Sequence, residues 1–115
     1  MKYTLYCVAL DYGDPFPVEV NKAQTVGDLK DKIMEKNKCK FTDFDANELT
    51  LYLLNIGGLD KQKRTEEIKS RAMALHNLVE LDTLHKLAKY FPDPGPREET
   101  IHILVKPPHG KSIDP

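Results

Sequence analysis

Several features that would assign a sequence quickly to a protein class are missing from these 115 residues. There is no tryptophan, and the two cysteines, Cys7 and Cys39, stand in unlike surroundings, so a disulfide framework is not expected. The 17 Lys and Arg residues nearly balance the 18 Asp and Glu residues, which disfavours a nucleic-acid interface driven by bulk positive charge. No apolar run approaches the roughly 18 residues that a membrane span needs. What remains is one ordinary globular domain, for which we expect neither nucleic-acid binding nor a membrane span.

The N-terminus carries no clear secretory signal. Lys2 precedes the largely apolar stretch Tyr3–Leu10, but Asp11 follows at once and no small-x-small cleavage pattern appears. The composition of Tyr3–Leu10 is instead typical of a β-strand.

Residues that could build a catalytic or metal centre are present, but their spacing does not fit that chemistry. A zinc site takes three or four converging ligands in paired spacings. No such pair is formed by the four histidines, which are His76, His85, His102 and His109. The Gly-Gly of "NIGGLDK" lacks the spacing of a phosphate-binding loop, and no G-x-S-x-G nucleophile motif occurs. We therefore expect no enzyme, no metal or other cofactor, and no small-molecule substrate.

One acidic run leaves two interpretations open. Asp43, Asp45 and Glu48 could form a cation site or an acidic docking patch of the PB1 type. A solvated, charged loop before a strand is the simpler interpretation.

The first half of the chain predicts a hairpin followed by a helix. Tyr3–Leu10 and Phe16–Val20 have strand composition, and the turn formers of Asp11–Pro15 lie between them. Pro17 has no N–H to donate, so it is expected at an edge or at the start of its strand. From Thr25, apolar residues recur at helical spacing for about three turns. Thr25 is the expected N-cap, with Asp28 completing a capping box.

The second half predicts a strand, two short helices and a closing strand. Glu48–Asn55 is the expected third strand, broken afterwards by Gly57 and Gly58. A helix opening at Thr65 is predicted from residues that recur at spacings of three and four, namely Ile68, Ala72, Leu75 and Val79. Asp82 is expected to cap a third, short helix that carries Leu84, Leu87, Ala88 and Phe91 and ends at "PDPGP". Thr100–Val105 is the closing strand.

This order of elements predicts an α+β domain with helices on a sheet. It matches a ubiquitin-like β-grasp, in which the first and last strands pair in parallel at the centre of the sheet. A ferredoxin-like split βαβ fold needs a helix between its first two strands, where this sequence has a turn. We expect residues 1–106 to form the domain and residues 107–115 to begin a linker, because Pro107 and Pro108 end the strand ladder.

Five segments, in order, resemble the N-terminal domain of the crinkler effectors of oomycetes and fungi. "LYCVAL", "FPVEV" and "VGDLKDKI" match the opening strand and helix of that domain. Its L-x-L-F-L-A-K motif corresponds to "LTLYLLN", with matching or similar residues at Leu49, Leu51, Tyr52, Leu53 and Leu54. Tyr52, Leu54 and Asn55 stand where the family has Phe, Ala and Lys. The loss of the Lys weakens the expectation of a charged transport signal here.

A second motif, H-V-L-V-x-x-P, closes the N-terminal domain of the family. It corresponds to "HILVKPP", and the matching or similar residues are His102, Ile103, Leu104, Val105 and Pro108. Ile103 replaces the family's Val.

The resemblance implies a non-catalytic module for targeting, translocation and protein interaction. It belongs to a secreted effector whose separate C-terminal domain acts inside a host cell, often in the nucleus. The alternative is an intracellular β-grasp adaptor of the PB1 or Ras-binding type that works by protein–protein docking. A conjugated modifier is not expected, because conjugation needs a terminal Gly-Gly and the one pair here, Gly57–Gly58, is internal.

Strand alternation also predicts a surface for a protein partner. Ile101, Ile103 and Val105 should face the helix, which leaves His102 and Leu104 on the other face of the sheet. Tyr52, His102 and Leu104 would then form an exposed, partly apolar patch of the kind that marks contact sites. Two alternatives stay open: the additional helices cover this face, or the patch serves self-association as a homodimer.

Overall fold

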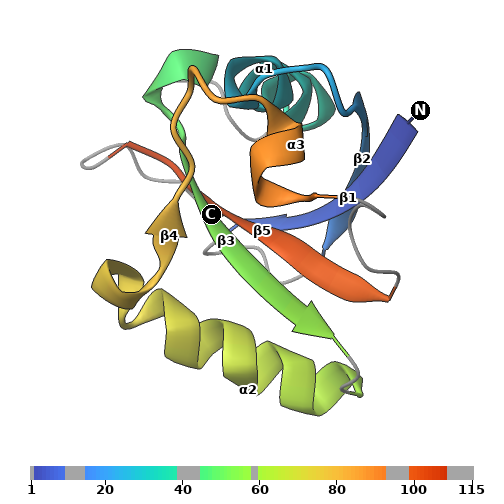
Figure 1. Cartoon of the computed structure of the whole chain (residues 1–115). Helices are drawn as coiled ribbons and strands as arrows, with labels where there is room; N and C mark the ends of the chain where they lie inside the picture. The colour runs from blue at the N-terminus through green and yellow to red at the C-terminus, as the bar shows by residue number, and fades with distance from the viewer. Residues whose placement is uncertain (1, 10–14, 39–44, 58–59, 93–98, 109–115) are drawn as a thin grey trace.

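The computed structural model describes residues 2–9, 15–38, 45–57, 60–92 and 99–108 (Figure 1). Cys39, Asp43, Gly58 and His109 lie outside the described residues, as does the expected linker from residue 109 onward. The predictions made for them are therefore not addressed by the structure.

A mixed sheet of five strands is the centre of the molecule, with strand order β2-β1-β5-β3-β4. Its strands are β1 (Lys2–Ala9), β2 (Phe16–Asn21), β3 (Thr50–Gly57), β4 (Val79–Glu80) and β5 (Thr100–Lys106). The α-helices are α1 (Val26–Lys36), α2 (Lys61–Ala72) and α3 (Leu87–Tyr90), and two short 3-10 helices are η1 (Ala46–Glu48) and η2 (Leu75–Asn77). The chain is thus α+β, as predicted.

The central strands pair as the sequence predicted. β1 and β2 are antiparallel, with Leu5 opposite Val18, and Pro17 lies on the edge strand. β1 and β5, the first and last strands, are parallel neighbours at the middle of the sheet, where Cys7 lies opposite Ile103. This arrangement is compatible with a β-grasp.

The first helix also forms as predicted. Thr25 Oγ1 accepts a hydrogen bond from the backbone N–H of Asp28 at 3.3 Å, and Asp28 Oδ2 accepts one from the N–H of Thr25 at 3.0 Å. This reciprocal capping box satisfies donors that the first turn leaves without helical partners. The apolar stripe of α1 is buried against the sheet through Val26, Leu29 and Ile33.

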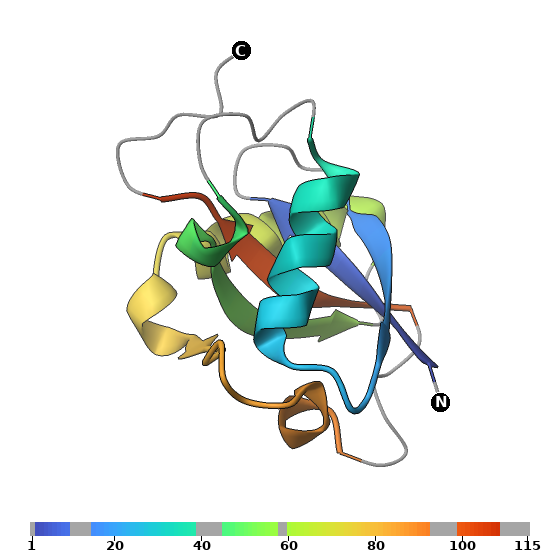
Figure 2. The same cartoon turned by 90° about the horizontal axis from the view of Figure 1, so that it is seen from above.

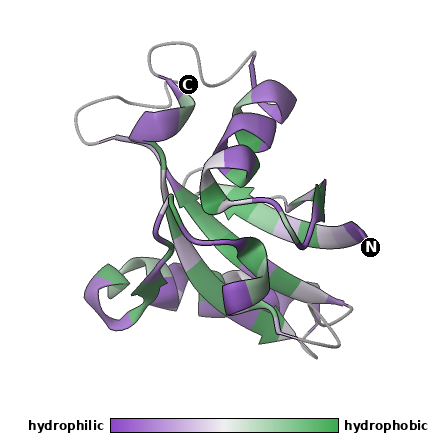
Figure 3. Ribbon diagram, turned by 45° about the horizontal axis from the view of Figure 1, so that its top comes forward, coloured by the Kyte–Doolittle hydropathy of each residue, from purple (hydrophilic) through white to green (hydrophobic). Residues whose placement is uncertain are grey.

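Helices cover both faces of the sheet, as the view from above shows (Figure 2). α1 and α3 lie on one face over a large apolar cluster to which Leu29, Ile33 and Leu87 contribute. α2 lies on the other face over a smaller cluster that includes Ile68 and Leu104. Figure 3 shows hydrophobic residues concentrated along the central strands, between these two helical layers.

The prediction for the second helix was wrong at both ends. α2 begins at Lys61 rather than Thr65, because Asp60 caps it: Asp60 Oδ1 accepts from the N–H of Lys63 at 2.8 Å. The helix ends at Ala72, and Val79 lies in β4, opposite Leu53. The spacing of apolar residues by three and four positions therefore continues past the end of α2 without marking a helix there.

The third helix and the end of the third strand also differ from the prediction. Asp82 does not cap α3: its Oδ1 accepts from the N–H of Leu84 at 2.9 Å, which makes a local turn, and α3 is the single turn Leu87–Tyr90. Gly57 does not break β3, because it is the last residue of the strand, opposite Thr100.

Candidate interaction surface

The two motifs that carried the family resemblance are neighbouring strands. "LTLYLLN" begins just before β3 and fills most of it, and "HILVKPP" fills most of β5. The strands are antiparallel, with Leu51 opposite Val105 and Leu53 opposite Ile103. The motifs, about 50 residues apart in the sequence, therefore form one ladder at the middle of the sheet.

All but one of the side chains of the first motif are buried or partly buried. Leu49 and Leu51 belong to the cluster beneath α1, and Leu54 belongs to the cluster beneath α2. Tyr52 and Leu53 are partly buried, and Asn55 is exposed. Asn55 has a φ of 50°, a conformation that Asn tolerates better than most residues, and the register of β3 against β5 shifts between Leu53 and Ile56. Asn55 is thus part of a β-bulge.

His102 is part of the core and interrupts the alternation of β5. Its side chain is 1% exposed, and its Nδ1 accepts a hydrogen bond from the backbone N–H of Tyr6 at 3.0 Å. The ring packs edge-on against Phe91, with centroids 5.7 Å apart. Because Nδ1 is the acceptor, this bond requires that nitrogen to be unprotonated.

The predicted exposed patch is wrong. His102 is buried, Leu104 is 0% exposed, and Tyr52 is partly buried. α2 and η2 cover this face of the sheet, which is the alternative that the sequence had left open. The strict alternation is also wrong for Ile101, which joins Leu104 beneath α2 instead of facing α1 with Ile103. The β-bulge opposite His102 accounts for this difference.

Burial also perturbs Tyr52. Burial raises the pKa of its phenol above the ordinary value, and the nearby Glu80 carboxylate raises it further. Glu80 lies opposite Tyr52 in the β3–β4 pair. Tyr52 therefore keeps its proton to higher pH than a free tyrosine does.

A groove lined by polar and apolar residues lies between α1 and the β2 edge. Its volume is about 550 Å³, with Thr4, Pro17 and Glu19 on the sheet side and Lys32, Glu35 and Lys36 on the helix side. A second hollow of about 510 Å³ shares Glu19 and Lys32 and extends toward Lys2 and Asn21. Both hollows are lined by positive and negative side chains.

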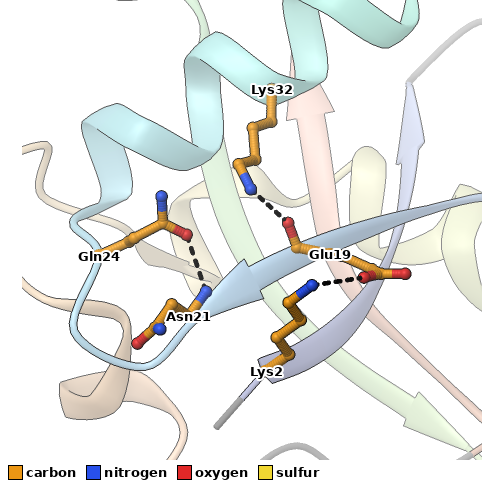
Figure 4. Close-up of polar contacts among 5 residues, drawn as sticks. All are labelled: Lys2, Glu19, Asn21, Gln24 and Lys32. Carbon is orange, nitrogen blue, oxygen red and sulfur yellow. Dashed lines mark hydrogen bonds and ion pairs between the residues drawn. The ribbon is translucent and has the colours of Figure 1, made fainter.

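Side chains occupy part of the backbone edge of β2 in this groove (Figure 4). Lys32 Nζ donates to the backbone carbonyl of Glu19 at 2.8 Å, and Gln24 Oε1 accepts from the N–H of Asn21 at 2.8 Å. Pro17 has no N–H. The edge is therefore poorly suited to adding another strand. The two hollows instead offer charged side chains, including a Lys2–Glu19 ion pair at 3.9 Å in the second hollow.

Reasoning from the sequence did not identify this groove. Its charged residues are Glu19 on β2 and Lys32, Glu35 and Lys36 on α1, at positions outside the apolar stripes of these two elements. Their pattern indicated solvent exposure, but only the tertiary structure shows that Glu19 and Lys32 lie within hydrogen-bonding distance of each other.

Lys30 lies on the same helix but is buried, with 6% of its surface exposed. Its Nζ donates to Thr83 Oγ1 at 2.8 Å and so connects α1 to the segment between β4 and α3. Burial lowers the pKa of the Lys30 ammonium, and the carboxylates of Glu80 and Asp82 oppose that effect. Lys30 is thus an internal contact rather than part of the groove.

The described residues hold no group of three or more His, Cys, Asp or Glu residues that could bind a metal ion. Burial raises the pKa of the Cys7 thiol, which makes Cys7 a poor nucleophile. Within the same described parts of the chain, no helix has the length and apolar character to cross a membrane.

Comparison with known proteins identifies relatives of this chain. Residues 3–106 match the family model described as the crinkler effector protein N-terminal domain. Crinkler effector protein 1 of Rhizophagus irregularis is 36% identical over 94% of this chain and 22% of its own length. Crinkler effector protein 8 of Phytophthora infestans is 32% identical over 97% of this chain and 20% of its own length.

A third relative and the solved structures complete the comparison. Crinkler effector protein 108 of Phytophthora sojae is 35% identical over 76% of this chain and 10% of its own length. The chain thus spans between a tenth and about a fifth of the length of these relatives. No solved structure matches the chain.

Proposed function

The chain belongs to the crinkler effector N-terminal domain family, and from this membership we propose that it is a non-catalytic module that targets and translocates an effector and binds protein partners. The observation that carries the proposal is the family match, which covers every strand of the sheet apart from the first residue of β1. The effector would be secreted and would act inside a host cell, with the nucleus as one destination.

We further propose that the domain is a ubiquitin-like β-grasp. Support comes from the strand order β2-β1-β5-β3-β4, the parallel β1–β5 pair and the position of α1 across the sheet. The helix α2 lies on the second face of the sheet, outside that plan. The domain would span residues 1–106, with a linker beginning at Pro107.

The burial of the two motifs suggests how they contribute to such a module. Three leucines of the motifs are at most 4% exposed, namely Leu51, Leu54 and Leu104. A receptor therefore cannot contact these side chains while the domain is folded. We propose that the motifs act by building the β3–β5 ladder. Translocation would then depend on the folded domain and on surface residues outside the ladder.

A reporter fusion tests the translocation role. Residues 1–115 are joined to the N-terminus of a luciferase, expressed in a filamentous fungus or an oomycete, and luciferase is measured in the medium and inside recipient plant cells. Uptake into plant cells should exceed that of luciferase alone by at least tenfold. Equal uptake with and without residues 1–115 would overturn the proposed function.

The same assay distinguishes a recognition role of the groove from a structural role of the β3–β5 ladder. Lys32→Glu changes a partly buried groove residue, whereas Leu54→Ala removes part of the core, and the free energy of unfolding of each variant is measured alongside uptake. Loss of uptake in Lys32→Glu at unchanged stability would place recognition in the groove. Loss only in Leu54→Ala would support the structural role of the motif.

The charged groove also supports the second candidate, an intracellular adaptor that docks to a protein partner. A partner with alternating charges could pair with Glu19, Lys32 and Glu35. The native reading frame distinguishes the candidates: continuation past Pro115 into a further domain favours the effector module, and a stop codon favours the adaptor. Sedimentation at increasing concentration tests self-association as a homodimer in either case.

A further inference from the structure

His102 connects the first and last strands at the point where their ladder begins. The β1–β5 pairing starts with Cys7 opposite Ile103, and the residues one position earlier on the two strands are Tyr6 and His102. The backbone N–H of Tyr6 donates to Nδ1 of His102 at 3.0 Å. A side chain thus extends the connection between β1 and β5 by one position, and it satisfies a partly buried backbone N–H.

This hydrogen bond fixes the protonation state of the ring. A backbone N–H can only donate, so Nδ1 must offer a lone pair, and the neutral ring carries its proton on Nε2. A ring with a proton on both nitrogens would place two donors 3.0 Å apart. Rotation of the ring by half a turn gives no relief, because Cδ2 would then replace Nδ1 and the N–H of Tyr6 would again face a group that cannot accept.

The packing around the ring disfavours a positive charge. The side chain of His102 is 1% exposed. The ring of Phe91 packs edge-on against it with centroids 5.7 Å apart, and the ring of Tyr6 stacks on it with centroids 6.5 Å apart and planes inclined by 26°. An imidazolium in this aromatic setting would lose its hydration and also the Tyr6 hydrogen bond.

The titratable and charged groups in this region come from β1, from α2 and its cap, and from the residue before β5. Among the described residues they are the side chains of Tyr3, Tyr6, Cys7, Asp60, Arg64 and Glu99. Asp60, Arg64 and Glu99 line a hollow of about 670 Å³ that Tyr6 also lines. The group stacked on the imidazole is the phenol of Tyr6, and a phenol is neutral at acid pH. It therefore offers no charge that would stabilise an imidazolium.

We propose that His102 is an acid-sensitive clip between β1 and β5. The neutral ring holds the N–H of Tyr6, whereas the protonated ring must release it and open this end of the β1–β5 pairing. In the unfolded chain a histidine has its ordinary pKa of about 6.5, so the unfolded chain takes up this proton more readily than the folded chain. The free energy of unfolding should therefore fall as pH drops below about 6.5. Acidification is thereby a signal that loosens the centre of the sheet, whether or not the chain acts as a translocation module.

Urea unfolding at about pH 7.5 and at about pH 5.0 tests the clip. In His102→Asn an amide oxygen replaces Nδ1 as the acceptor and takes up no proton in this range, and His76→Asn is the control because His76 is exposed. If the folded chain takes up no proton at His102, this residue alone raises the equilibrium constant for unfolding about thirtyfold over the interval.

The rise in that constant should be at least ten times larger in the unaltered chain and in His76→Asn than in His102→Asn. Only the change with pH is compared, so a loss of stability that is the same at both pH values does not affect the result. An equal rise in all three chains would overturn the proposal.

Nuclear magnetic resonance of the unaltered chain tests the clip without a substitution, and it decides the matter if His102→Asn does not fold. The ring nitrogen signals of His102 should show a proton on Nε2 and none on Nδ1 at about pH 7.5. On acidification, the Tyr6 N–H signal of the folded chain should change over the same pH range in which this ring becomes protonated. A proton on Nδ1 at neutral pH, or protonation of the ring with an unchanged Tyr6 N–H signal, would overturn the proposal.

Discussion

Leu104 provides a direct test of the burial of the family motifs. The sequence placed it on an exposed patch, whereas the structure places it at 0% exposure among residues of three strands and α2. Leu104→Ala removes the equivalent of three methylene groups, which at about 0.8 kcal/mol each amounts to about 2.4 kcal/mol of lost transfer free energy. A cavity in a well-packed site raises the expected cost to about 3 kcal/mol.

The loss should be large relative to the stability of the domain. A natural domain of this size has a free energy of unfolding of about 5–15 kcal/mol, so the variant would lose a fifth or more of it. Urea unfolding followed by far-UV circular dichroism measures the change, and the thermal midpoint should fall by about 10 °C.

Leu84 is the matched control, because the same substitution there removes a side chain that is 85% exposed. Leu84→Ala should change the free energy of unfolding by no more than about 0.5 kcal/mol. If Leu104→Ala cost no more than Leu84→Ala, Leu104 would not be in the core, and the structural role assigned to the motifs would be refuted.

Three further predictions concern single contacts. Gly57→Ala should cost about 1–3 kcal/mol, because its Cβ would lie 2.6 Å from Thr100 Oγ1, and the cost should shrink in a Thr100→Ala background, as a double-mutant cycle in urea would show. Thr25→Ala should cost about 1 kcal/mol by removing the cap of α1, with Thr25→Ser as a nearly neutral control. Burial lowers the pKa of Lys30, so the unfolded chain keeps that proton to higher pH than the folded chain. The free energy of unfolding should therefore rise with pH between the pKa of Lys30 in the folded chain and its ordinary value of about 10.4. The free energy of unfolding is measured against pH for the unaltered chain and for Lys30→Met. A difference between the two chains that stayed constant across this range would contradict the assignment.

Elements governed by local chemistry were predictable from the sequence. The capping residues Thr25 and Asp28 and the apolar spacing of α1 act within one or two turns, so the helix formed where it was expected. The hairpin strands and the closing strand were predictable for the same reason. The order of the elements then favoured one sheet topology, with β1 and β5 parallel at its centre. Elements that depend on distant contacts were not predictable: β4 is two residues long and exists through its pairing with β3.

The candidate surfaces show the same division. The sequence by itself determined the family, the α+β class and the two strands that carry the motifs, because these follow from residue identity and short-range periodicity. Only the tertiary structure decided which face of each strand is covered. α2, a helix with one buried residue among those described, lies over Leu104, and a β-bulge at Asn55 shifts the register opposite His102. Side-chain exposure depends on packing between segments far apart in the chain, and alternation along a single strand sorts residues onto two faces without showing which faces are covered.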